Sequence, residues 1–236
     1  MLRKILLSCF LVASVGLLHA QVRFGVKGGL NLNQPYSGDN DKTPPSGIPP
    51  FGWPTDQFDQ KLTWHAGLTA DIPVAKNLHI RPDLIFSRKI AELKKEENSP
   101  TSQMKYIERL KADYLELPVQ FVYYQQKKNI AWYAGGGPYF GLGISGKARK
   151  DYFFKSGDGL NMQIESNTAR EDDWYQQFQV GAVLAVGIEL PFGLMGELSA
   201  RHGFNDASKS KLVDNVNKIY QFSYGFSMGY LLNRRK

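Results

Sequence analysis

The sequence predicts an all-β protein, an eight-stranded antiparallel up-and-down transmembrane β-barrel, on three observations. Apolar and polar residues alternate with a period of two in eight segments of the 236-residue chain. The connections between these segments are alternately short and long, and aromatic residues gather at both ends of the apolar faces. Alternating segments of roughly ten residues joined in this way are typical of transmembrane barrels. Two of the long connections have room for another hairpin, which would give ten strands.

Residues 1–20 have the three parts of a secretory signal peptide. Two basic residues precede an apolar run from Ile5 to Leu18, and the small residue Ala20 follows. The run is shorter than the ~20 residues that a transmembrane helix needs. We therefore expect export and cleavage after Ala20, which leaves residues 21–236 as a single outer-membrane β-barrel domain.

The composition of the exported chain excludes several classes of function. Its one cysteine, Cys9, lies in the leader, so disulfides and thiol chemistry contribute nothing after cleavage. Without the two basic residues of the leader, 27 basic residues stand against 22 acidic ones, a formal charge of +5. We expect no nucleic-acid partner, because an exported chain has no need of one and no base-stacking module is present. The positive charge favours anionic lipid or polysaccharide head groups.

Four strands are predicted in the first half of the chain. In each, large apolar residues recur at every second position, and polar or charged residues fill the positions between them. The apolar faces run over Val22–Leu32, Leu62–Ile72, Leu78–Phe86 and Leu115–Tyr123. The opposite faces carry the charged residues Arg23, Lys27, Asp71, Arg81, Asp83 and Glu116.

Four further strands are predicted in the second half, with apolar faces over Ile130–Ile144, Phe178–Ile188, Leu198–Phe204 and Tyr220–Leu232. The third of these is the weakest, because only Leu198 and Ala200 alternate clearly with Glu197 and Arg201. The last is the strongest, since every second residue is large and apolar and the residues between are Gly, Ser or Gln. Such a face suits lipid, and the small residues behind it suit a crowded lumen.

The connections between the predicted strands define two different ends of the barrel. Three are short, namely 73–77, 124–129 and 191–194, and four are long, namely 35–60, 89–113, 146–175 and 205–218. Outer-membrane barrels have tight periplasmic turns and long external loops. The alternation therefore predicts a protein of the cell outer membrane with both termini on the periplasmic side.

Aromatic residues on the apolar faces predict two girdles, one at each water interface. Near the short turns lie Tyr123, Trp132 and Tyr230. Near the long connections lie Trp64, Phe86, Phe140, Phe178, Tyr220 and Phe222. Further aromatic residues in the first long connection are candidates for external contacts, namely Tyr36, Phe51, Trp53 and Phe58.

Four segments resemble the PorT-like outer-membrane β-barrel proteins of Gram-negative bacteria. They are FGVKGGLNLN at the start of the exported chain, YLELPVQF, AGGGPYFGLGISGK and SYGFSMGYLL. The resemblance covers essentially the whole exported chain and implies an eight-stranded barrel in the outer membrane. The namesake of that family takes part in protein secretion across this membrane, so the resemblance also suggests a secretion-accessory role.

The inward faces predict a network of opposite charges that fills the lumen, because an eight-stranded barrel is just wide enough for its own side chains. The candidate residues are Lys27, Asp71, His79, Arg81, Asp83, Glu116, Glu197 and Arg201. Folding the second hairpin about Ala75 pairs residues whose numbers sum to 150. That register places His79 opposite Asp71 and His65 opposite Ile85.

No cofactor or metal site is expected, because this register keeps the two histidines on the order of 20 Å apart along the strands. No catalytic residue is predicted either, since no serine lies at an obvious spacing from a histidine. We expect a non-enzymatic barrel with a structural, surface-binding or secretion- and assembly-accessory role. Its partners would be outer-membrane lipid, lipopolysaccharide and a protein bound through the external loops. Two alternatives remain at this point, a lipid-modifying outer-membrane enzyme and a soluble periplasmic barrel that binds an apolar ligand inside.

Overall fold

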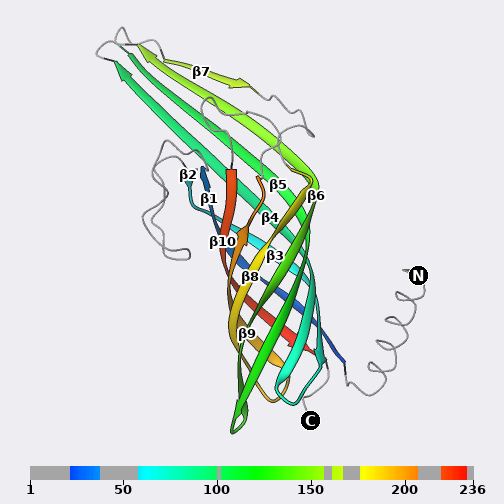
Figure 1. Ribbon diagram of the computed structural model, residues 1–236. Coiled ribbons are helices and arrows are strands. Elements are labelled where there is room, and N and C mark those ends of the chain that lie inside the picture. The colour runs from blue at the N-terminus through cyan, green and yellow to red at the C-terminus, as the bar shows by residue number, and fades with distance from the viewer. Residues whose placement is uncertain are drawn as a thin grey trace, which may run out of the picture.

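Eight strands close into one antiparallel barrel, as the sequence predicts (Figure 1). The computed structural model describes residues 22–37, 58–99, 102–156, 161–166, 176–206 and 219–232. In ring order the barrel strands are β1 (Arg23–Ser37), β3 (Lys61–Pro73), β4 (Leu78–Ser99), β5 (Ser102–Lys127), β6 (Ile130–Ser156), β8 (Phe178–Glu189), β9 (Leu194–Gly203) and β10 (Ile219–Leu231). Pairing of β10 with β1 closes the ring. Within the described ranges, no helix has the length and apolar character needed to span a membrane.

The barrel wall is apolar outside and polar inside. Phe24 and Leu184 are 61% and 66% exposed on the outer face, whereas the inward Asp71 and Arg81 are completely buried. Every apolar face that the alternation predicts points outward. Because side chains on a strand alternate between the two faces, this outcome also fixes the inward position of the residues between them.

The short turns and the two described chain ends lie at the same end of the barrel, here called the short-turn end. The Leu232 amide donates a hydrogen bond to the Phe24 carbonyl (2.7 Å), and the Leu231 amide donates to Gly193 in the β8–β9 turn (2.9 Å). Gly193 has a φ of 95°. A Cβ atom there would lie 2.4 Å from the Leu231 carbonyl oxygen, so only glycine fits this turn.

The prediction that 89–113 and 146–175 are loops is wrong for most of their length. β4, β5 and β6 continue far beyond the barrel, and two short strands, β2 (Phe58–Asp59) and β7 (Asn161–Ser166), pair with β4 and β6. Figure 1 shows β4, β5, β6 and β7 extending away from the barrel. We call residues 88–99, 102–113, 145–156 and 161–166 the projecting sheet. Its sequence alternates poorly because outward residues need to be apolar only within the bilayer, so the period-two apolar signal stops where the membrane band stops.

The predicted register of the β3–β4 hairpin is also wrong, by two residues in the sum. Pro73 pairs with His79 and Thr69 with Asp83, so the paired numbers sum to 152. The Leu78 carbonyl accepts hydrogen bonds from the amides of both Val74 and Ala75 (2.9 and 3.0 Å). Two turn residues therefore oppose one, which moves the centre from Ala75 to the next residue. His65 accordingly pairs with Ser87 and not with Ile85.

Candidate functional site

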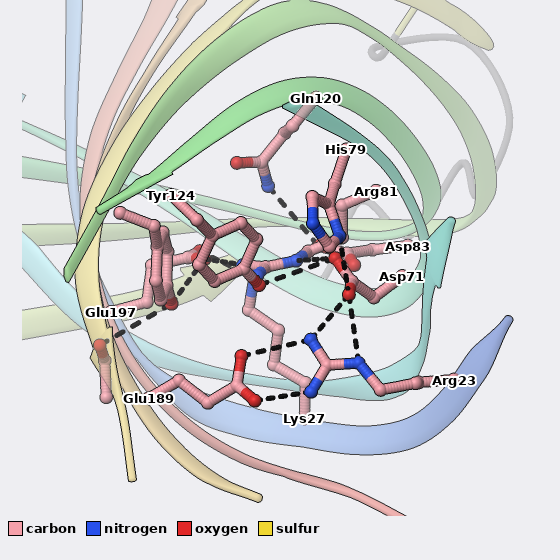
Figure 2. A network of polar contacts seen from close by, with 12 residues as sticks. Arg23, Lys27, Asp71, His79, Arg81, Asp83, Gln120, Tyr124, Glu189 and Glu197 are labelled. Carbon is pink, nitrogen blue, oxygen red and sulfur yellow. Dashed lines mark hydrogen bonds and ion pairs between the residues drawn. The ribbon is translucent and has the colours of Figure 1, made fainter. Parts of the chain in front are cut away.

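The lumen near the short-turn end is filled by a cluster around Asp71 (Figure 2). Arg23 on β1 donates to Asp71 through Nε (3.1 Å) and Nη2 (2.5 Å), and it also pairs with Glu189 on β8. Nδ1 of His79 lies 3.0 Å from the same Asp71 oxygen. The predicted contact between His79 and Asp71 is therefore present, although their backbones are not paired as predicted.

Lys27 and Arg81 form the next set of ion pairs in the lumen. Lys27 Nζ lies 3.0 Å from Asp83 and 2.5 Å from Glu197, and Arg81 Nη1 lies 3.2 Å from Glu197. Arg81 also lies over two aromatic rings, 5.6 Å from the centroid of Tyr124 and 4.4 Å from that of Tyr133. Cations over aromatic faces gain further stabilisation where water is excluded. Four strands therefore meet at one guanidinium group.

A separate group of contacts in the lumen is centred on Glu116. Its carboxylate pairs with Arg201 (2.9 Å) and with Lys89 (2.7 Å). Lys89 also donates to the Gln179 side chain (2.7 Å), and the Gln179 amide donates to the Tyr114 hydroxyl (3.1 Å). Lys89 was assigned to a loop by the sequence pattern, so its role was missed. Parity could have revealed it: Asp83 and Ser87 are odd-numbered residues of β4 that point inward, and Lys89 is the next odd-numbered residue after Ser87.

All eight candidate residues of the sequence analysis thus point into the lumen; seven lie in ion pairs, and His79 is hydrogen-bonded to Asp71. The pairs form two groups, one around Arg81 and one around Glu116, where one network was expected. Arg23 and Glu189 complete the first group and Lys89 the second. An isolated buried charge is very costly, so this pairing is the condition under which the closed lumen can hold so many charges.

Four tyrosines occupy much of the space between the charged groups, and the strand glycines make room for them. Tyr114, Tyr124, Tyr133 and Tyr139 are all nearly fully buried. A Cβ atom on Gly187 would lie 2.4 Å from the Tyr133 ring, and one on Gly181 would lie 2.3 Å from the Tyr139 ring. These glycines on β8 therefore permit close approach of the two rings.

The structure also brings together His65 and Ser227, a pair that the sequence analysis did not anticipate. His65 Nε2 lies 2.8 Å from the Ser227 hydroxyl, and both residues are buried. Their contact comes from strands β3 and β10, so no sequence spacing could reveal it. Among the described residues, His65 Nδ1 has no hydrogen-bond partner, and no group of His, Cys, Asp and Glu could hold a metal ion.

The predicted girdle residues that the structure describes lie on the outer face or at its rim. Trp64 and Phe86 are neighbours, with ring centroids 5.5 Å apart, and Tyr123 and Trp132 are more than half exposed. The external candidates divide differently. Tyr36 lies within β1 and Phe58 within β2, not in a loop, and Phe51 and Trp53 fall outside the described residues.

A filled lumen predicts that the purified protein does not conduct ions. In planar lipid bilayers it should give no steady single-channel steps, because side chains fill the lumen and the charges there are paired. A porin reconstituted in the same way serves as the positive control. Reproducible steps of constant size from this protein would contradict a sealed lumen and would indicate transport.

The sequence matches a family described as the outer membrane protein beta-barrel domain over residues 18–209. Among curated proteins, no match was found. Similar solved structures include OprG from Pseudomonas aeruginosa, at 14% identity and a TM-score of 0.39, covering 90% of this chain and 97% of that one. The attachment invasion locus protein Ail of Yersinia pestis, solved with the heparin analogue sucrose octasulfate, has 8% identity and a TM-score of 0.35, covering 89% and 98%. Neisserial surface protein A has 10% identity and a TM-score of 0.35, covering 88% and 96%.

Proposed function

Because the chain belongs to the outer membrane protein β-barrel domain family, we propose that it is a sealed, non-enzymatic anchor that presents the projecting sheet to a protein partner. The main support for this proposal is the unequal length of the strands. β5 and β6 have 26 and 27 residues, whereas β8 and β9 have 12 and 10. A barrel that served only to span the bilayer would need strands of ~9–11 residues.

The orientation that we propose places the projecting sheet outside the cell and both termini in the periplasm. Support comes from the three short turns, which share one end with the described chain ends. Outer-membrane barrels keep their short turns on the periplasmic side. The projecting sheet would then meet the extracellular medium.

The two alternatives of the sequence analysis have less support. A lipid-modifying enzyme needs a nucleophile that lipid can reach and a base held by a third group. The Ser227–His65 pair is buried in the closed lumen, and His65 Nδ1 has no hydrogen-bond partner among the described residues. A soluble barrel that binds an apolar ligand inside would need an apolar interior, but this interior is lined by charges and its apolar residues face outward.

The secretion-accessory role suggested by the PorT-like resemblance is the form of partner binding that we propose. β7 is an outer strand of the projecting sheet in the part of the chain that the structure describes, and its sequence, NMQIES, contains one charged residue. β4 at the opposite side carries KKEE at 94–97, and such charges oppose strand addition. An extended segment of a secretion or assembly component would add to the β7 edge through backbone hydrogen bonds.

A trimmed variant tests this proposal. Replacing residues 92–109 by Asn-Gly keeps the paired Ala91 and Leu110 in register on either side of a two-residue turn, and deleting residues 149–166 as well leaves the barrel strands intact. We expect the trimmed protein to remain in the outer membrane and to migrate faster on gels before boiling than after it. Crosslinking in intact cells followed by purification should recover a protein partner with the full chain only. Equal recovery with the trimmed chain would contradict the role given to the projecting sheet.

A further inference from the structure

A groove of about 500 Å³ crosses the outer face of the barrel near the short-turn end. It runs over five strands, β5, β6, β8, β9 and β10, between two rows of outward side chains that are direct cross-strand partners. The row nearer the turns contains Gln125, Trp132, Ile188 and Gly196, and the second row, two residues farther along each strand, includes Ala134 and Leu198. The volume lies in the range of small-molecule pockets.

The groove exists because small residues stand where the outward pattern otherwise has large ones. Gly196 lies on β9 between the outward Leu194 and Leu198, and Ala134 takes the corresponding place on β6. A Cβ atom on Gly196 would meet one described atom within 4 Å beyond its chain neighbours, Cγ1 of Ile188 at 3.9 Å. This is an ordinary van der Waals contact. A larger side chain would therefore start here without a clash and would occupy the groove.

The groove is apolar and lies where hydrocarbon meets the lipid head groups. Trp132, Val186 and Leu198 are each more than half exposed on the outer face. Trp132 belongs to the girdle at the short-turn end, and aromatic girdles mark the two interfaces of the bilayer. The outer face of a membrane barrel is surrounded by lipid, so acyl chains reach the groove from the side. A chain lying in a groove makes more dispersion contacts than one lying on a flat wall.

Polar groups that suit a phosphate head group follow the groove on the same face of β5. Gln125 and Lys127 are two residues apart and both exposed, so Lys127 lies ~7 Å along the strand from Gln125, toward the turn. Among the described residues at this end of the barrel, the acidic ones are all buried in the lumen, namely Asp71, Glu189 and Glu197. The outer surface beside the groove is therefore suited to an anionic group.

We propose that the groove holds one acyl chain of a glycerophospholipid whose phosphate lies near Lys127. In the orientation proposed above, this lipid belongs to the periplasmic leaflet. The two rows would bury the chain, the Gln125 amide would donate to the ester or phosphate oxygens, and the ammonium group of Lys127 would add a point charge. The site lies at the opposite end of the barrel from the projecting sheet, so it does not depend on a protein partner.

The test uses the whole exported protein in detergent, titrated with phosphatidylglycerol and with diacylglycerol of the same chains, and native mass spectrometry counts the bound lipids. The wild type should saturate with a single phosphatidylglycerol, and diacylglycerol should bind about tenfold more weakly, a factor that corresponds to ~1.4 kcal/mol. Gly196→Phe fills the groove and should weaken phosphatidylglycerol binding about tenfold or more. Gly196→Ala adds only a Cβ atom and should bind like the wild type. Lys127→Gln should reduce the preference for phosphatidylglycerol over diacylglycerol.

The matched control is Ala200→Phe, four residues along β9 on the same outer face but outside the groove. It should bind like the wild type, and an equal loss in both phenylalanine variants would overturn the site. Faster gel migration before boiling than after it checks that each variant is folded, and the comparison of the two lipids needs no variant. Absence of saturable binding to the wild type would overturn the groove as a lipid site, and equally tight binding of diacylglycerol would overturn the phosphate assignment. A dimer that Gly196→Phe abolishes would show that a second copy, and not a lipid, occupies the groove.

Discussion

Leu184→Arg should lower the free energy of unfolding from lipid vesicles by about 2–4 kcal/mol, the cost of a cation at the midplane of a bilayer. Leu184 lies in the middle of β8, its side chain is 66% exposed on the outer face, and its cross-strand partners are Gly136 and Ala200. None of these neighbours can pair with an arginine. The measurement is a denaturant titration of the folded protein in vesicles, followed by tryptophan fluorescence.

The control for Leu184→Arg is Gln125→Arg, on the same outer face but close to the short-turn end of β5. An arginine near the interface can reach water, so its cost should be about 0–1 kcal/mol. Gln179→Arg is not a suitable control, because Gln179 is buried and accepts a hydrogen bond from Lys89. If Leu184→Arg and Gln125→Arg cost the same, the outer face of β8 does not contact the hydrocarbon region.

The barrel itself could be predicted from the sequence, because strand period and membrane chemistry act on the same residues. Each outward residue of a spanning strand must be apolar, so Phe24, Leu184 and Phe226 reveal the face on which they lie. The inward position of Asp71 and Glu116 then follows from parity alone. Strand pairing in a closed up-and-down barrel adds no further choice, since each strand pairs with its neighbours in the chain.

The projecting sheet could not be predicted from apolar alternation, because outward residues have to be apolar only where a strand lies within the membrane. In the segment KIAELKKEENS at 89–99, charged residues stand at both odd and even positions, so no apolar face is left to recognise. The hairpin register depends on the two hydrogen bonds to the Leu78 carbonyl, a detail of turn geometry. The contact of His65 with Ser227 depends on the registers of β3 and β10 against β1, which place both residues beside Gly29.

Arg81→Met should be the most damaging single change in the lumen, at about 3–5 kcal/mol, the usual cost of breaking a buried ion pair from one side. Arg81 is fully buried, pairs with Glu197 at 3.2 Å and lies 3.9 Å from Asp71. Its loss leaves Lys27 to neutralise both Asp83 and Glu197. Methionine retains much of the length of the arginine side chain, so little of the packing against the tyrosine rings is lost. Unfolding in vesicles provides the measurement.

Arg88→Met offers a control of the same residue type on the same strand. Arg88 also pairs with a carboxylate, Asp113 at 2.7 Å, but its side chain is 29% exposed, and such pairs contribute about 0–1 kcal/mol. The double variant Arg81→Met/Glu197→Gln should recover part of the loss, because it leaves Lys27 with Asp83 and Arg23 with Asp71. A double variant that is less stable than Arg81→Met would show that charge pairing does not hold the lumen. The contribution of Arg81 would then lie in its contacts with the rings of Tyr124 and Tyr133.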